Sequence, residues 1–157
     1  MMRVLVTEGD WHVRAYLVWL LNTMGHGASG VGGLEAMSRR VARRAPDAVL
    51  CDANPSDGDG IEACRRLKCL WPDLPVVIMA WDPSWLARAR GAALGPVLLK
   101  PFSPPELRDA LTLVMFSHLR TTLARAVFDL NTQNDHSRAQ IEKSKTAPAA
   151  INVRSKP

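Results

Sequence analysis

The chain has 157 residues, of which 47% are hydrophobic, and it carries a formal net charge of +5 at pH 7. This length is enough for one domain with a buried core and a short extension, and no apolar stretch approaches the roughly 20 residues of a membrane-spanning helix. The three cysteines lack metal-ligand spacing, and Met1 leads directly into an apolar strand rather than a signal sequence, so we expect reduced thiols and a cytoplasmic location.

Short apolar runs typical of buried strands alternate along the chain with segments of helical periodicity. Glycine is so frequent in the segment 25–33 that we expect the strand within it to be the weakest. The last helix begins with a capping box, Ser103-Pro104-Pro105-Glu106. The predicted strands are 3–7, one within 25–33, 48–52, 75–80 and 97–99. This alternation predicts an α/β fold, a five-stranded parallel sheet with helices on both faces.

Ionisable side chains follow three of the predicted strands where each strand ends. Glu8 and Asp10 follow the first strand, Asp52 ends the third and Lys100 follows the fifth. In an open α/β sheet the carboxyl ends of the strands meet at the edge where ligands bind. Acidic clusters and one lysine at this edge suggest a site for a divalent cation and a phosphoryl group. Asp10 has two interpretations, a metal ligand or the N-cap of the first helix.

A spaced set of residues carries a resemblance to a known family. The set comprises Val4-Leu5-Val6 before the acids, Asp52, Asp59-Gly60, and Lys100-Pro101-Phe102. Over roughly residues 2–117 the chain resembles the receiver domain of bacterial two-component response regulators. The resemblance implies a flavodoxin-like sheet in the order 2-1-3-4-5. It also implies that Asp52 accepts a phosphoryl group from a histidine kinase or a histidine phosphotransferase, and that Lys100 binds the phosphoryl oxygens.

The resemblance further implies a magnesium site, because a divalent cation offsets the repulsion between a carboxylate nucleophile and a phosphoryl group. The implied ligands are Glu8, Asp10, Asp52 and the main chain of Asn54. Gly9 stands where the family has a second acid, so we expect magnesium to bind weakly.

Three further departures from the family pattern concern switching. Ala80 replaces the Ser or Thr whose hydroxyl binds the phosphoryl group, and Val97 replaces the aromatic switch residue. Trp81 stands at a position that is usually small, where it would crowd the mouth of the pocket. Ala80 and Val97 predict that phosphorylation changes the face formed by the fourth and fifth strands little.

We expect a receiver domain over residues 1–117, a helical extension over 118–130 and a disordered basic tail over 131–157. The extension continues an apolar seam at steps of three and four residues, which suggests a homodimer or partner contact through the last helix. The seam consists of Phe116, Leu119, Leu123, Val127 and Leu130. Residues 118–157 carry seven basic and three acidic side chains, but no aromatic residue follows Phe128, so we expect no nucleic-acid or membrane partner.

The function predicted from the sequence is that of a single-domain response regulator that is not an enzyme and acts through protein–protein interaction. One alternative is a pseudo-receiver that no longer switches by phosphorylation and works as a constitutive scaffold. An alternative of another class is a nucleic-acid-associated accessory protein that uses the basic tail. A small doubly wound enzyme is disfavoured because the sequence offers no nucleophile–base pair or cofactor loop.

Overall fold

In the computed structural model the described residues are 1–146, with side chains described for residues 1–134, 136 and 137. The chain divides into two compact units, Met1–Leu119 and Arg120–Pro157. The first unit contains the sheet and every site residue predicted from the sequence. No helix among the described residues combines the length and the apolar character needed to cross a membrane.

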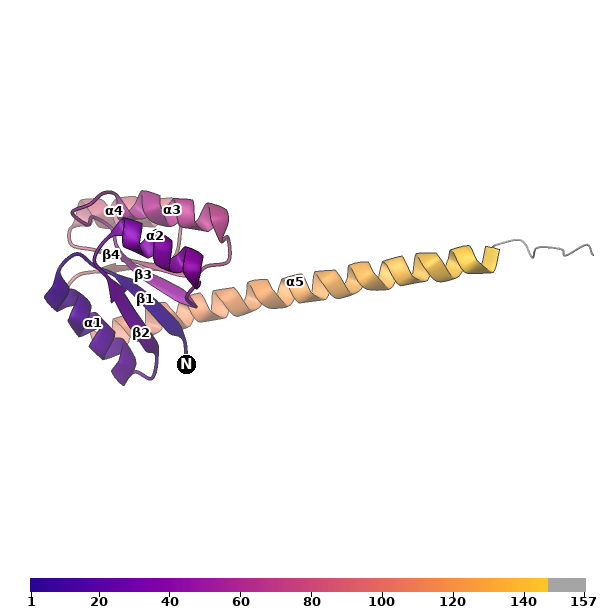
Figure 1. Ribbon diagram of the computed structural model, residues 1–157, viewed down its shortest axis with the longest axis horizontal. Helices are drawn as coiled ribbons and strands as arrows, with labels where there is room; N and C mark the ends of the chain where they lie inside the picture. Colours follow the sequence, from indigo (N-terminus) through magenta and orange to yellow (C-terminus); the bar gives the residue numbers. More distant parts are fainter. Residues whose placement is uncertain (147–157) are drawn as a thin grey trace, which may run out of the picture. The chain divides into compact units, whose positions relative to one another are not determined.

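Five parallel strands form one sheet in the order β2-β1-β3-β4-β5 (Figure 1). Their bounds are β1 (Arg3–Thr7), β2 (Gly27–Val31), β3 (Ala48–Asp52), β4 (Val76–Ala80) and β5 (Val97–Leu99). The central strands β3 and β4 are buried along their whole length. The glycine-rich β2 is an edge strand and is partly exposed, as expected for a strand with few side chains to pack. The predicted fold class and strand order are confirmed.

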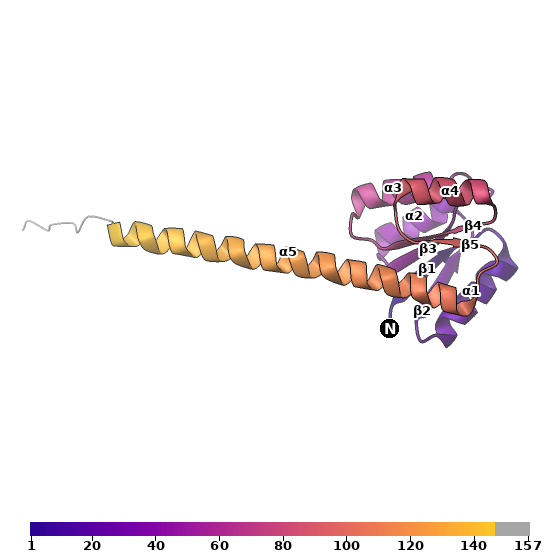
Figure 2. The ribbon, with the colours of Figure 1, turned by 180° about the vertical axis from the view of Figure 1, so that it is seen from behind.

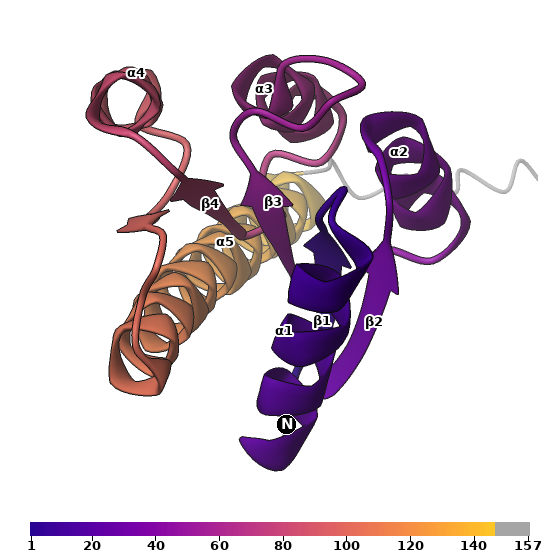
Figure 3. The ribbon, with the colours of Figure 1, turned by 90° about the vertical axis from the view of Figure 1, so that its left-hand side faces the viewer.

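Helices cover both faces of the sheet, as Figures 2 and 3 show from two directions. The helices are α1 (Trp11–Thr23), α2 (Leu34–Arg43), α3 (Gly60–Leu70), α4 (Pro83–Ala92) and α5 (Pro104–Thr146). One face packs against α2, α3 and α4, and the opposite face packs against α1 and the beginning of α5. Successive side chains of β1 point to opposite faces of the sheet. Leu5 packs in the core on the side of α2, α3 and α4, and Val4 and Val6 pack in the core on the side of α1 and α5.

Helix α5 runs to Thr146 instead of ending near Leu130, so the expected disorder is wrong for residues 131–146. Residues 147–157, the rest of the predicted tail, lie outside the described residues. The absence of apolar periodicity after Asn131 suggested an unfolded segment. However, residues 106–147 contain neither glycine nor proline, and extending an existing helix costs far less than nucleating one.

Candidate functional site

The carboxyl edge of the sheet brings three of the predicted site residues together. Glu8 follows β1, Asp52 ends β3 and Lys100 follows β5, and these side chains are only 4–5% exposed. Because β1 and β3 are neighbours in the sheet and β5 lies two strands from β3, the long Lys100 side chain has to cross over the end of β4. The Lys100–Pro101 peptide bond is cis.

Lys100 joins the two carboxylates. Its Nζ donates to Glu8 Oε2 at 2.5 Å and lies 3.2 Å from Asp52 Oδ1. The second contact is an ion pair without hydrogen-bond geometry, because Asp52 Oδ1 is buried and has no hydrogen-bond partner. Glu8 is held at both oxygens, since its Oε1 accepts from the backbone N–H of Asp10 at 3.1 Å. The cluster is therefore a buried acid–lysine–acid arrangement.

Burial raises the pKa of Asp52 above its ordinary value, and the nearby charge of Glu8 raises it further. The Lys100 ammonium and the backbone N–H of Asn54 act in the opposite direction, but they do not cancel the cost of burial. Keeping Asp52 ionised in the folded protein therefore costs more free energy than keeping it ionised in water. A carboxylate in this state gains stabilisation from any further positive charge that reaches it.

Asp10 and Asn54 hold the two other positions implied for magnesium binding. Asp10 is exposed, and its Oδ1 accepts from the N–H groups of His12 at 2.8 Å and Val13 at 3.1 Å. This is the capping alternative for Asp10, and a metal-ligand role for it stays a prediction. Asn54 lies two residues beyond Asp52, with its N–H directed at the Asp52 carboxyl group.

The described residues contain no group of three or more His, Cys, Asp or Glu side chains placed to hold a metal ion. Glu8 and Asp52 nevertheless offer two neighbouring carboxylates, and Asp52 Oδ1 has free lone pairs. Magnesium prefers six oxygens, of which several are commonly water or phosphate oxygens. The donor set thus fits a weakly held magnesium ion, with few protein ligands.

Sequence reasoning missed Arg14, an α1 residue that holds the loop after β1. Its Nη1 donates to the carbonyl oxygens of Glu8 at 2.5 Å and Gly9 at 3.1 Å. The sequence signal for this contact was the position of Arg14 one turn beyond the N-cap Asp10, from which a long side chain can reach back to the preceding loop. Arg14 is thus bound to the main chain of the loop that carries Glu8.

The loop between β3 and α3 is tied to two helices by aspartates whose contacts the sequence did not reveal. Asp57 Oδ2 accepts from the N–H of Leu34 at 2.7 Å, which supplies the N-terminal cap that Gly33 cannot provide. Asp59 caps α3 through the N–H of Glu62 at 3.0 Å and also forms an ion pair with Arg88 of α4. Glycine has no side chain to cap a helix, so Gly33 before α2 was a sign in the sequence that another part of the chain supplies the cap.

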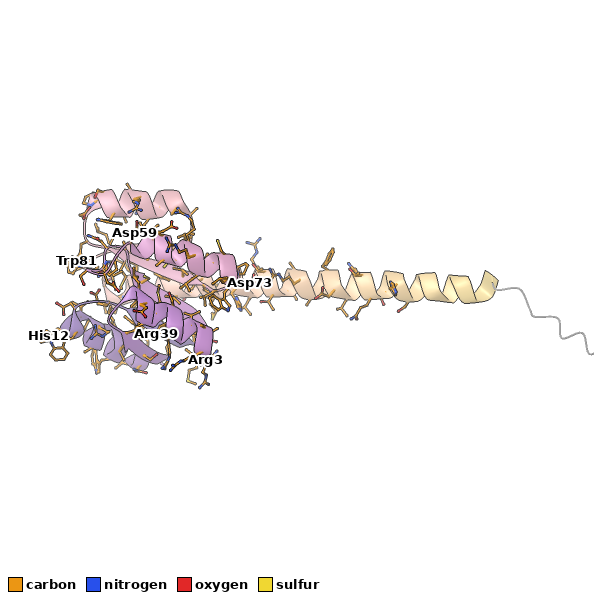
Figure 4. The ribbon with its side chains drawn as sticks, turned by 45° about the horizontal axis from the view of Figure 1, so that its top comes forward. Arg3, His12, Arg39, Asp59, Asp73 and Trp81 are labelled. Atoms are coloured by element: carbon orange, nitrogen blue, oxygen red, sulfur yellow. The ribbon has the colours of Figure 1, made fainter. Side chains whose placement is uncertain are left out.

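Of the three residues named above as departures that concern switching, Ala80 and Trp81 contact Lys100. Ala80 ends β4 in full burial, and its carbonyl accepts from the N–H of Lys100 at 2.7 Å. Trp81 is 58% exposed, and its ring centroid lies 5.1 Å from Lys100 Nζ. Val97 is partly buried at the start of β5. In Figure 4, Trp81 and Asp59 lie toward one end of the sheet, and Arg3 and Asp73 lie toward the other.

Comparison with known proteins agrees with this geometry. Residues 4–112 match the family described as "Response regulator receiver domain". The chain is 35% identical over 109 residues to the response regulator MprA of Mycobacterium leprae, covering 68% of this chain and 47% of that protein. It is 31% identical over 124 residues to the KDP operon transcriptional regulatory protein KdpE of Escherichia coli, covering 78% of this chain and 55% of that protein.

A solved structure, a putative response regulator from Chloroflexus aurantiacus, is 25% identical and superposes with a TM-score of 0.67. This similarity covers 72% of this chain and 96% of that structure. A buried aspartate beside a lysine, at the carboxyl edge of a sheet of order 2-1-3-4-5, is typical of one class of signalling domain. The chain belongs to the response regulator receiver domain family.

Receiver domains support phosphorelay signalling, are generally not enzymes and typically bind Mg²⁺ at the phosphorylation site. The chain spans about half the length of the curated relatives it matches, 47% of MprA and 55% of KdpE.

Proposed function

We propose that this chain is a cytoplasmic response regulator that accepts a phosphoryl group on Asp52 from a histidine kinase or a histidine phosphotransferase. We propose further that it acts through protein–protein interaction and catalyses no reaction on another substrate. The observation that supports this best is the position of the Lys100 ammonium, between the carboxylates of Glu8 and Asp52. A lysine that is ion-paired with a buried carboxylate can also bind the oxygens of a phosphoryl group transferred to that carboxylate, which supports the proposal.

In the transfer step, an oxygen of ionised Asp52 attacks phosphorus while the bond from phosphorus to the donor imidazole nitrogen breaks. The electron pair of that bond stays on the imidazole, which then takes a proton from solvent. The Lys100 ammonium, which donates to Glu8, then also donates to the phosphoryl oxygens. Because the contact with Glu8 already orders the Lys100 side chain, binding the phosphoryl group costs little further conformational entropy. Glu8, Asp10, Asp52 and the main chain of Asn54 would hold a magnesium ion, and its positive charge would offset the repulsion between the carboxylate and the phosphoryl group.

We propose that the interaction surface includes the apolar seam of α5, and that a second copy of this chain binds there. The seam residues are 50–67% exposed: Phe116, Leu119, Leu123, Val127 and Leu130. Apolar side chains at steps of three and four residues on an exposed helix mark a helix–helix contact.

A second candidate function is the pseudo-receiver scaffold, which Ala80 favours. Ala80 offers no hydroxyl to the phosphoryl group, and no polar side chain replaces it at the end of β4. A scaffold of this kind keeps the fold and the partner surfaces but takes no phosphoryl group.

Intact-mass measurement after incubation with acetyl phosphate and magnesium separates the two candidates. We expect the mass of one added phosphate on the native chain and none on Asp52→Asn. The matched control is Asp57→Asn, which removes a nearby loop carboxylate and should leave the added mass in place. No added mass on the native chain would leave only the scaffold function, whereas label on Asp57 or Asp59 would overturn the assignment of Asp52.

A further inference from the structure

The Lys100 ammonium has a third neighbour besides its two carboxylates, the ring of Trp81. The chain leaves β4 at Trp81 and β5 at Lys100, and Ala80 pairs with Leu99 in the register of these strands. The two residues therefore leave neighbouring parallel strands at the same level of the carboxyl edge. The indole centroid lies 5.1 Å from Lys100 Nζ, within the range of a cation–π contact.

The two side chains differ sharply in exposure. Lys100 is 5% exposed, whereas Trp81 is 58% exposed. Glu8 and Asp52 are themselves buried, so of these three neighbours of the ammonium the Trp81 ring is the one that is exposed to solvent. The Trp81 ring is therefore part of the outer cover of the charged cluster.

From this arrangement we propose that Trp81 is a positioning residue that holds Lys100 and limits the access of water to the Asp52 site. The proposal rests on the function proposed above. A ring over Lys100 stabilises the ammonium in the orientation that meets the phosphoryl oxygens. The same ring lies on the solvent side of the ammonium, where it limits the approach of water.

The limited access of water has a direct consequence for the lifetime of the phosphorylated state. Hydrolysis requires a water oxygen to attack phosphorus while the bond from phosphorus to the Asp52 oxygen breaks. The carboxylate keeps the electron pair of that bond, and the attacking water loses a proton to solvent. An indole ring over the site reduces the access of that water, so the acyl phosphate is expected to live longer than in a chain with a small residue at position 81.

The test compares Trp81→Ala, Trp81→Phe and native chains, with Trp19→Ala as the control for losing an exposed tryptophan. Trp19 is 60% exposed on α1, and its ring contacts Tyr16 rather than the site. We expect Trp81→Ala to load from acetyl phosphate and to lose phosphate about three- to tenfold faster, an estimate from the strength of cation–π contacts. Trp81→Phe should restore near-native rates because it keeps an aromatic face over Lys100, and Trp19→Ala should not change them.

A second measurement needs no phosphorylation. The acylation rate of Lys100 by a water-soluble succinimidyl ester is read by peptide mapping, with Lys68 as the internal reference. We expect this rate to rise severalfold in Trp81→Ala and to stay low in Trp81→Phe. An unchanged Lys100 rate in Trp81→Ala, or an unchanged acyl-phosphate lifetime, overturns the proposal. A native chain that takes no phosphoryl group overturns the proposed function instead.

Discussion

The guanidinium of Arg88 in α4 forms an ion pair with the carboxylate of Asp59, the residue that caps α3. This pair connects the helix after β4 with the loop that follows Asp52. Burial raises the pKa of Asp59, but the Glu62 N–H and Arg88 outweigh it and hold that pKa below its ordinary value. Arg88 also lies over the Trp85 ring, with 4.8 Å from its Cζ to the ring centroid.

The two partners of this pair should differ in their contribution to stability. Arg88→Gln removes a partly exposed ion pair and should lower the free energy of unfolding by about 1 kcal/mol or less. Asp59→Ala also removes a helix cap and should cost about 1–2 kcal/mol. Urea unfolding of both variants measures the difference. Equal costs would mean that the cap contributes nothing beyond the ion pair.

The raised pKa of Asp52 predicts that its ionisation opposes folding. A carboxyl group whose folded-state pKa lies above its unfolded value destabilises the fold at neutral pH. That penalty disappears as the pH falls through the raised folded-state pKa toward the ordinary value of 3.8. Asp52→Asn should therefore be more stable than the native chain at pH 7, and the gap should narrow on acidification toward pH 3.8.

Asp47 offers a control of opposite sign. Its side chain hydrogen-bonds with Arg3, which holds the pKa of Asp47 below its ordinary value. Asp47→Asn should therefore lose stability at pH 7, and its difference from the native chain should also shrink in acid. Thermal unfolding of the two variants and the native chain at pH 7 checks both signs, and measurements continued below pH 3.8 check the loss of the Asp47 contribution. A destabilised Asp52→Asn at pH 7 would show that Lys100 outweighs burial.

Gly9 is the simplest place to strengthen the magnesium site. A Cβ at Gly9 would have its nearest contacts at 3.9 Å, so the backbone accommodates a side chain there. Gly9→Asp adds a third carboxylate near Glu8 and Asp52, and it should tighten magnesium binding about tenfold or more from an affinity weaker than millimolar. Calorimetric titration with magnesium measures the change.

The neutral substitution Gly9→Asn is the matched control, and it should bind magnesium no better than about twofold over the native chain if charge is what the site lacks. Micromolar magnesium affinity in the native chain, or equally tight magnesium binding by Gly9→Asp and Gly9→Asn, would contradict the expectation that the site lacks a negative charge.

The residues at the ends of β4 and β5 predict a weak conformational response. A ligand shifts an equilibrium only by its differential contacts with the two states. Ala80 has no hydroxyl to follow a phosphoryl group, and Val97 has no ring to move in response. Amide spectra with and without beryllofluoride and magnesium should therefore nearly overlay across residues 80–102, apart from the immediate neighbours of Lys100. Wide shifts throughout that range would show that another contact, such as Asp59–Arg88, carries the signal.

The sequence predicted the sheet and the acid–lysine cluster because both depend on local patterns. Apolar runs ending at Asp52 and before Lys100 determine where the two side chains emerge, whatever the details of packing. The contact of Arg88 with Asp59 could not be predicted, because it joins α4 to the start of α3, and their relative placement depends on side-chain packing across the core. The length of α5 was misjudged for another reason. Polar helix-forming residues after Asn131 resemble a disordered tail in composition, and periodicity cannot tell the two apart.

The exposed seam of α5 predicts self-association. Fully burying an apolar side chain of this kind contributes about 1.5–3 kcal/mol, so several of them on two copies can offset the entropy lost on association. Leu123 is 67% exposed, and Leu123→Glu should weaken a dimer by about 100-fold or more because both copies lose the contact. Thr132→Glu is the control, since Thr132 is displaced from the seam by about half a turn from Leu130. Sedimentation equilibrium of the full chain should show a dimer that Leu123→Glu dissociates and Thr132→Glu leaves intact. A native chain that stays monomeric at about 100 μM would refute self-association through α5.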